Sequence, residues 1–244
     1  MGRGVKWKFT PDQFIHVWEA AGLDRIPYPL SVRPSDRTDN ERAARLKELA
    51  GWHRVFATPE VDVALRVLAS PELRVEVFGL VGQDDSRPIR VLGAGVGDAV
   101  AVVSQVPGVT PDVGGNITLT LGPPETLPAR IVSALPTVDA GREPTRSASL
   151  AEVEQDSKNI VMSSPTVKSV AGQVRKALNA PRNGIGQMLA TTRLDAKVAH
   201  PPEVLSWIDV ARDGRYLVRT GADVDVVPAT KDVLVAELLR LLQS

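Results

Sequence analysis

Apolar residues recur at helical spacing in several stretches of the chain, and three of these stretches begin with a hydroxyl residue followed by proline. Thr10, Thr58 and Ser164 each precede a proline. A hydroxyl side chain at Ncap accepts a hydrogen bond from the first turn, and proline at N1 costs nothing because its missing N–H would be unpaired anyway. We therefore expect helices to begin at residues 11, 59 and 165.

Two helix starts also carry the reciprocal pattern of a capping box. Gln13 stands three residues after Thr10, and Glu41 stands three residues after Thr38. The apolar stripes of the expected helices are Phe14, Trp18 and Ala21; Leu46 and Leu49; Val61, Leu65 and Leu68; and Val167, Val170 or Ala171, Val174 and Leu178. Stripes at this spacing predict core packing rather than contacts with a cofactor.

Runs rich in Val, Ile and Leu, bounded by Gly, Pro and Asp, predict strands. They cover residues 73–81, 89–96, 99–106, 117–121, 187–192, 205–210, 216–219 and 224–227. The fourth and the eighth run are each followed by a proline, Pro123 or Pro228, and then by an amphipathic helix. Short turns between consecutive strands favour an antiparallel sheet, so we expect an α+β fold.

The same order of elements occurs twice along the chain. We interpret residues 1–138 and 149–244 as two quasi-repeats within a single domain, 1–244, joined by a polar connector at 139–148. A short capped helix is expected at Ser149. The turn at Gly97 and Asp98 would then match the turn at Asp213 and Gly214, which we interpret as a two-residue type I′ turn in the hairpin at 207–218.

Composition limits the possible functions. The chain has 244 residues, 29 Lys plus Arg against 29 Asp plus Glu, and no cysteine. Zero net charge is unlike a protein that grips phosphate backbones, so nucleic-acid binding is not expected. Without an apolar leader or a run of about 18 apolar residues, we expect a cytoplasmic protein with no membrane insertion.

Motifs for catalysis, cofactors or metals are weak. Gly93, Gly95 and Gly97 lack the third glycine and the helix of a dinucleotide loop, and favour a twisted hairpin. Residues 182–187, RNGIGQ, are interpreted as a turn that enters a strand, with anion binding as the weaker alternative.

Acidic and histidine residues form only loose groups. Asp12, His16 and Glu19 share a helical ridge, where a metal site competes with an ordinary solvated face. The carboxylate pairs Asp84 with Asp85 and Asp209 with Asp213 are typical of turns. We assign no catalytic, cofactor-binding or metal-binding residue.

Three segments, residues 7–30, 182–187 and 207–218, together resemble the EspG family, the cytosolic chaperones of type VII (ESX) secretion in actinobacteria. The resemblance implies a central antiparallel sheet flanked by two helical bundles, with two halves related by a quasi-twofold axis. It also implies binding of a cognate PE–PPE heterodimer at the tip of PPE. The implied contacts lie on the central sheet and the C-terminal helical bundle, near a variable loop between the second and third strands. Counting a first strand at 5–9, this loop is residues 83–88 and is short.

No binding residue transfers position by position from this resemblance. On chemical grounds we select Arg212, Arg215, Tyr216 and Arg219 as cargo-binding candidates, because aromatic and guanidinium groups are favoured anchors. The alternative is that Tyr216 is packed and the arginines only solubilise the surface. The free protein is expected to be a monomer or a weak homodimer. Two other functions stay open: an interaction or regulatory module outside secretion, and an enzyme of unrecognised type.

Overall fold

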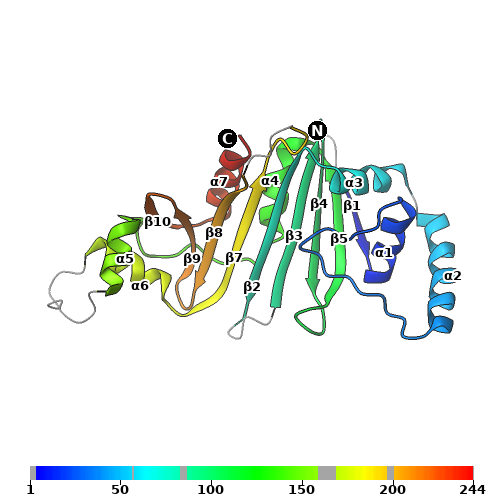
Figure 1. Ribbon diagram of the computed structural model, residues 1–244, viewed down its shortest axis with the longest axis horizontal. Coiled ribbons are helices and arrows are strands. Elements are labelled where there is room, and N and C mark those ends of the chain that lie inside the picture. Colours follow the sequence, from blue (N-terminus) through cyan, green and yellow to red (C-terminus); the bar gives the residue numbers. More distant parts are fainter. Residues whose placement is uncertain (1–3, 57, 83–86, 159–168, 197–200, 244) are drawn as a thin grey trace.

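The chain builds one ten-stranded antiparallel sheet, seen broadside in Figure 1. The computed structural model describes residues 4–56, 58–82, 87–158, 169–196 and 201–243. The strand order is β1-β5-β4-β3-β2-β7-β8-β9-β10-β6. The strands are β1 (Val5–Phe9), β2 (Leu73–Val81), β3 (Arg87–Val96), β4 (Ala99–Pro107), β5 (Gly114–Gly122), β6 (Arg146–Ser149), β7 (Arg182–Thr191), β8 (Glu203–Val210), β9 (Gly214–Thr220) and β10 (Asp223–Pro228). The antiparallel α+β fold class predicted from the sequence is confirmed.

Helices cover both faces of this sheet. They are α1 (Pro11–Ala20), α2 (Asp39–Phe56), α3 (Pro59–Ala69), α4 (Leu127–Ser133), α5 (Leu150–Lys158), α6 (Val170–Leu178) and α7 (Lys231–Gln243), with a 3₁₀ turn at Pro124–Thr126. One face packs on α4 and α7, in a core that includes Val77, Met188 and Trp207. On the opposite face, α1 and α3 cover one end through Phe14 and Leu65, and α6 covers the other.

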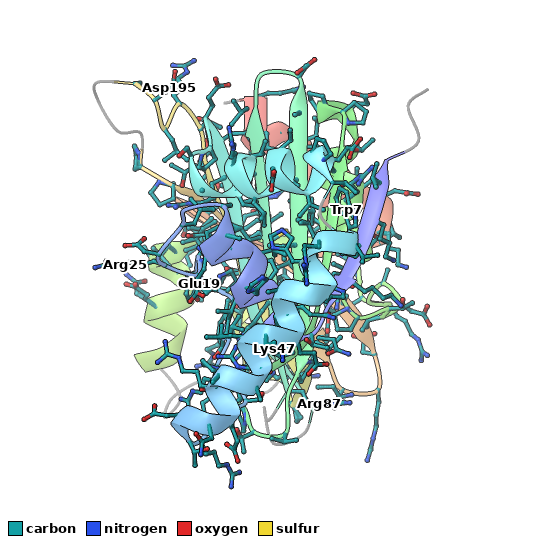
Figure 2. All side chains as sticks on the ribbon, turned by 90° about the vertical axis from the view of Figure 1, so that its right-hand side faces the viewer. Trp7, Glu19, Arg25, Lys47, Arg87 and Asp195 are labelled. Carbon is teal, nitrogen blue, oxygen red and sulfur yellow. The ribbon has the colours of Figure 1, made fainter. Side chains whose placement is uncertain are left out.

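Helix α2 lies furthest from the sheet. Figure 2 looks onto this side of the molecule and shows α2 with Lys47 in front of the sheet. Among the described residues of α2, only Leu49 is buried, while Trp52 and Phe56 are partly buried against Phe9. An aromatic cluster therefore attaches this helix at one end and leaves most of its surface exposed.

The strand order runs in the same sense from either edge of the sheet. From one edge it is β1-β5-β4-β3-β2, and from the other it is β6-β10-β9-β8-β7. At the middle, β2 pairs with β7, for example Gly79 with Gly186. Division into halves 1–138 and 149–244 stays a proposal, which this order supports. Strand β6 begins at Arg146, inside the stretch predicted to be a connector, and the sequence did not reveal it.

The predicted helix starts hold wherever the structure describes them. Thr10 and Gln13 form the expected capping box, and Thr38 and Glu41 bond reciprocally. Helix α3 begins at Pro59 as expected, although Thr58 makes no side-chain cap bond. Ser164 and its proline lie outside the described residues. The described helix α6 begins later, at Val170, where the hydroxyl of Ser169 accepts from the backbone N–H of Gly172.

The turn predicted at residues 182–187 is wrong, because β7 begins at Arg182. Its glycines serve a packing need. A Cβ built at Gly186 would lie 2.2 Å from the indole ring of Trp207, which is fully buried. The glycine that resembled a turn signal makes room for a side chain of the next strand.

The type I′ turn predicted at Asp213 and Gly214 is also wrong. Three residues, 211–213, connect Val210 to its partner Gly214, and the positive φ of 64° belongs to Arg212. By contrast, the hairpin between Val96 and Ala99 has the expected two-residue tip, with Gly97 at φ 53°.

Candidate functional site

The centre of the sheet is uncovered on the face that carries α1, α3 and α6. We call this surface the central strip. It comprises the half-buried or exposed side chains of Phe78, Leu80, Ile185, Gln187, Leu189, Val204, Ser206 and Val218. These residues alternate along their strands with the residues packed on α4 and α7, so they point to the opposite face.

Cross-strand register arranges the central strip in rows. Phe78 is opposite Gln187, which is opposite Ser206, and Ser206 is opposite Val218. Leu80 faces Ile185 in the next row. Polar groups of Gln187 and Ser206 therefore stand among the apolar side chains of the central strip, and the Glu76 carboxylate lies beside it, because Glu76 is opposite Leu189.

A hollow of about 330 Å³ lies in the central strip beside the end of α6. Its lining includes Phe78, Leu80 and Ile185 from the sheet and Leu178 from the helix. The side chain of Arg182 closes this end by donating from NH2 to the carbonyl oxygen of Leu178 at 3.1 Å. The helix thus supplies a wall and the strands supply a floor.

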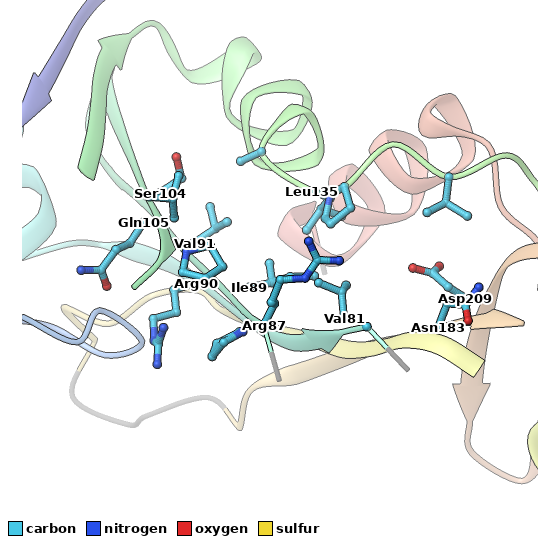
Figure 3. Close-up of a pocket in the computed structure, with 17 residues that line it drawn as sticks. Val81, Arg87, Ile89, Arg90, Val91, Ser104, Gln105, Leu135, Asn183 and Asp209 are labelled. Atoms are coloured by element: carbon cyan, nitrogen blue, oxygen red, sulfur yellow. The ribbon is translucent and has the colours of Figure 1, made fainter. Parts of the chain in front are cut away.

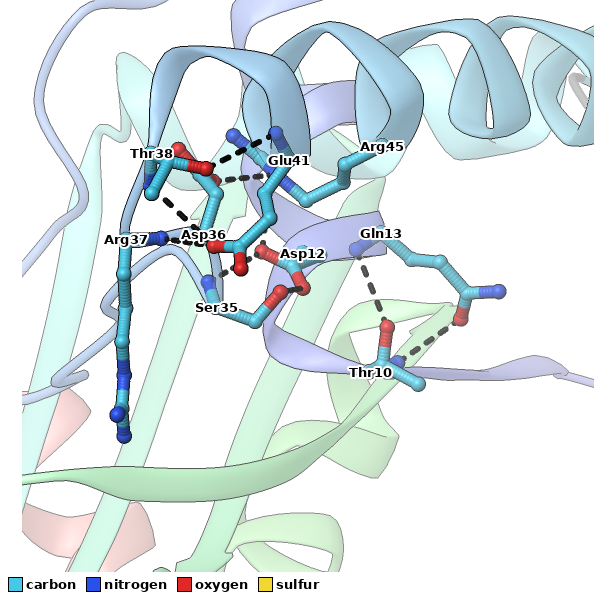
Figure 4. A network of polar contacts seen from close by, with 9 residues as sticks. All are labelled: Thr10, Asp12, Gln13, Ser35, Asp36, Arg37, Thr38, Glu41 and Arg45. Atoms are coloured by element: carbon cyan, nitrogen blue, oxygen red, sulfur yellow. Dashed lines mark hydrogen bonds and ion pairs between the residues drawn. The ribbon is translucent and has the colours of Figure 1, made fainter.

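The segment between α1 and α2 bounds the central strip on the other side. It is held by the polar contacts shown in Figure 4, in which the backbone N–H of Ser35 donates to Asp12 at 3.1 Å and Arg45 pairs with Asp36 at 2.6 Å. Arg45 also reaches Asp12 at 3.3 Å. These contacts fix the course of the segment over the sheet.

A larger hollow, about 700 Å³, opens on the opposite face near the end of α4, as Figure 3 shows. Apolar side chains such as Ile89, Val91 and Leu135 line much of it, while Arg87 reaches through its middle toward Leu135 and Asp209 lies at one side. The Asp209 carboxylate is already bound by Arg215. Because both of its oxygens accept hydrogen bonds from Arg215, this carboxylate is not a free acid in the hollow.

Arg215, one of the predicted cargo-binding residues, is buried with an exposed fraction of 2%. Its Nε donates to Asp209 Oδ1 at 2.7 Å and its NH2 donates to Oδ2 at 2.9 Å. The guanidinium carbon also lies 5.8 Å from the ring centroid of Trp207. These contacts give Arg215 a structural role in the sheet.

Tyr216, the second candidate, is equally buried at 2%. Its hydroxyl donates to Asp213 Oδ2 at 2.5 Å and accepts from the backbone N–H of Glu143 at 2.9 Å. Burial and the bond to Asp213 raise the pKa of Tyr216 to about 12. The position of Tyr216 agrees with the alternative interpretation, in which this tyrosine is packed in the protein.

The remaining two candidates are more accessible. Arg212 is exposed at the hairpin tip. Arg219, whose side chain is 37% exposed, donates to Glu237 at 2.6 Å and lies 3.9 Å from Asp225. Contact between cargo and these four residues stays a prediction. Of the four, Arg212 is the one that is classed as exposed.

The other acidic and histidine candidates have separate partners. Asp12 binds Ser35 and Arg45, and the ring of His16 lies edge-on to His53 at 5.1 Å. In the described part of the chain, no group of three His, Asp or Glu residues is arranged to hold a metal ion. Asp84 and Asp85 lie outside the described residues. Gly93 packs against α4, because a Cβ there would lie 2.6 Å from Ile131.

The central strip was missed by the sequence analysis, although a signal existed. In the run LRVEVFGLV, Phe78 and Leu80 stand on the opposite face from Val75 and Val77. A strand that is apolar on both faces is either covered on both or exposes an apolar surface.

An antiparallel sheet with helices at both ends of one face and an open centre between them defines an α+β protein with a surface suited to another macromolecule. The sequence matches the model of the EspG family over residues 10–240, so the chain belongs to the EspG family.

Solved structures extend this comparison. The chain is similar to the Mycobacterium tuberculosis type VII secretion system chaperone EspG5, solved in complex with the PE25–PPE41 dimer, with a TM-score of 0.62 and 17% identity over 98% of this chain and 97% of that chain. This likeness shows the shared fold. HtdX of Mycobacterium tuberculosis, at a TM-score of 0.17 and 11% identity over 92% of this chain and 98% of that chain, supports no conclusion.

Two further findings are negative. None of the curated proteins compared with the chain matches it. No helix within the described ranges is both long and apolar enough to span a bilayer.

Proposed function

We propose that this chain is a non-catalytic chaperone of type VII (ESX) secretion that binds the PPE tip of a cognate PE–PPE heterodimer in the cytoplasm and keeps it soluble and competent for export. Membership of the EspG family and the fold shared with EspG5, which was solved with a PE–PPE dimer, support this proposal. An apolar tip left in water is an aggregation risk, and a surface that buries it removes that risk.

The central strip is the observation on which the proposed location of the cargo depends. Its apolar rows offer burial to apolar side chains, while Gln187 and Ser206 offer hydrogen bonds in the middle. The side of a helix has no unpaired backbone groups, but the end of a helix and its loop do. This combination fits the tip of a helical bundle better than the flank of a helix.

Co-expression with a candidate cognate PE–PPE pair tests the function. The chain should convert that pair into a soluble complex that elutes as one peak in size-exclusion chromatography. PPE that stays insoluble in the presence of the chain would count against the proposal.

A substitution in the central strip tests the location. Gln187 is exposed, so Gln187→Arg should leave the fold intact and abolish the complex, because a charge then enters an apolar contact. Val55→Arg, on the 90% exposed Val55 of α2, is the matched control and should bind normally. Equal binding by both variants would place the contact elsewhere.

A further inference from the structure

Tyr28 presents an aromatic ring to solvent at the edge of the central strip. Its exposed fraction is 58%, and its ring centroid lies 6.2 Å from that of Phe78, with the planes tilted by 37°. Phe78 belongs to the row that contains Gln187. Tyr28 therefore extends the apolar surface of the central strip from a segment outside the sheet.

The backbone on either side of Tyr28 is fixed. Leu30 is buried at 9% exposure in the core under α1 and α3. Ser31 exchanges two hydrogen bonds with the side-chain amide of Gln105: its N–H donates to Oε1 at 2.8 Å, and its carbonyl accepts from Nε2 at 3.0 Å. The N–H of Leu30 also donates to the carbonyl of Pro27 at 3.1 Å. Because the backbone around Tyr28 is already ordered, binding of a partner to this ring does not include the entropic cost of ordering it.

The charged side chains that act on the phenol, Glu76 and Arg90, belong to strands β2 and β3. Burial and the nearby Glu76 carboxylate raise the pKa of Tyr28, while Arg90 opposes them. Glu76 pairs with Arg74 at 3.4 Å, and Arg90 donates to the carbonyl of Pro111 at 2.6 Å. The hydroxyl is thus a neutral donor at physiological pH, beside charges that already have partners.

We propose that Tyr28 anchors the cargo from the N-terminal side, so that the bound tip lies between this ring and Leu178 of α6. The inference rests on the proposed function and adds to it: the resemblance implies contacts on the sheet and the C-terminal helices, whereas Tyr28 belongs to the segment between α1 and α2. In Figure 1 this segment reaches over the sheet from one side and α6 lies toward the other. The ring of Tyr28 fits an apolar side chain of the cargo that packs on it.

The physical reason is the position of the ring. An exposed aromatic side chain on a fixed backbone, next to an apolar floor, gains buried area on binding at a small cost in conformational entropy. Tyrosine is also among the residue types enriched at energetically dominant interface positions. Truncation of this ring should therefore cost affinity and leave the fold unchanged.

Titration calorimetry with a PE–PPE heterodimer that the unsubstituted chain binds tests the anchor. Tyr28→Ala should weaken binding by about 10-fold or more, the loss typical of an anchor residue. Tyr28→Phe keeps the ring and should stay within about 3-fold of the unsubstituted chain, since only a hydrogen bond is lost. Val55→Ala, which shortens an exposed apolar side chain on α2, is the control and should bind normally.

Thermal melting of each variant shows whether the fold is intact. All three variants should melt within about 2 °C of the unsubstituted chain, because both side chains are exposed. If the unsubstituted chain binds and Tyr28→Ala binds equally well, the anchor is wrong while the chaperone function stands. If the unsubstituted chain binds no PE–PPE pair, the function itself fails.

Discussion

The carbonyl oxygen of Ala140 lies 2.5 Å from the point where a Cβ of Gly214 would stand. The connector runs beside β9 here: Arg215 N–H donates to the carbonyl of Asp139 at 2.8 Å, and Gly141 N–H donates to the carbonyl of Arg215 at 2.9 Å. Gly214 is thus required for a close approach of two backbones.

Gly214→Ala should therefore destabilise the protein although its φ is ordinary. The added methyl has to push the connector away, and overpacking of this kind costs about 1–3 kcal/mol. Gly221→Ala is the control, because nothing lies within 4 Å of its Cβ position. Urea unfolding should show the loss only for Gly214→Ala, and equal free energies of unfolding would contradict the packing explanation.

Removal of one partner of the Asp209 and Arg215 ion pair should be costly. The side chains are 4% and 3% exposed, so the remaining charge would be buried without compensation. Arg215→Met or Asp209→Leu should each lower the free energy of unfolding by about 3–5 kcal/mol. The double variant Asp209→Leu with Arg215→Met should lose less than the sum of the two, as measured in a double-mutant cycle. An additive result would mean that the pair does not couple.

Tyr216 should make stability depend on alkaline pH. Its pKa rises from 10.0 to about 12 in the folded protein, so the folded state keeps its proton more firmly than the unfolded chain. The contribution is complete below pH 10 and is lost as the pH rises from 10 to about 12. Tyr216→Phe should reduce the free energy of unfolding by about 1–2 kcal/mol at pH 8 and flatten this alkaline decline.

Tyr28→Phe provides the comparison, because Tyr28 is the other of the two tyrosines and its raised pKa, in a largely exposed side chain, should contribute less to the alkaline decline than that of Tyr216. Urea titrations at pH 8 and pH 11 should separate the variants. A decline in Tyr216→Phe as steep as in the unsubstituted chain would assign the alkaline effect to other groups.

His16 should make stability depend on acid pH in the opposite sense. Burial and the neighbouring His53 lower the pKa of His16 below 6.5, Arg45 adds to this, and Glu19 opposes it. The unfolded chain then binds the proton more readily, so stability present above pH 6.5 declines as the pH falls. Urea unfolding followed by tryptophan fluorescence should show this decline, and His16→Gln should remove it.

His53→Gln removes the second cause of the lowered pKa and leaves burial in place. It should therefore weaken the acid dependence without abolishing it. An unchanged dependence in His16→Gln would assign the acid effect to carboxylates instead.

Local patterns explain what the sequence could predict. Thr10 with Gln13, and Thr38 with Glu41, satisfy the first turns of their own helices, so nothing distant is needed to recognise them. The strands at 73–81 and 99–106 were also predictable, because apolar runs between turn residues are local signals. Fold class followed from the order of such elements.

Contacts between distant segments explain what the sequence could not predict. Gly186 is a glycine because Trp207 of the neighbouring strand needs the space, and Gly214 because the connector passes beside it. From sequence alone, both glycines resemble turn residues. A four-residue strand such as β6 is likewise defined by its pairing with β10 rather than by its own composition.

Burial was the missing quantity at the candidate site. Arg215 and Tyr216 have the chemistry of surface anchors, but Asp209 and the connector cover them. Conversely, the central strip consists of ordinary strand residues whose exposure depends on where α1, α3 and α6 end. Neither the burial of Arg215 and Tyr216 nor the exposure of the central strip is determined by the residues next to them in the sequence.

The pairing of β2 with β7 has a consequence during synthesis of the protein. Val81 pairs with Gly184, so one middle strand leaves the ribosome long before its partner. Until β7 is made, β2 is an open edge of a five-stranded sheet on the nascent chain, and this edge strand carries Phe78 and Leu80. Such an edge can pair with other chains, and closing it requires a slow contact between remote segments. The surface proposed to protect cargo is thus itself unprotected during part of its own translation.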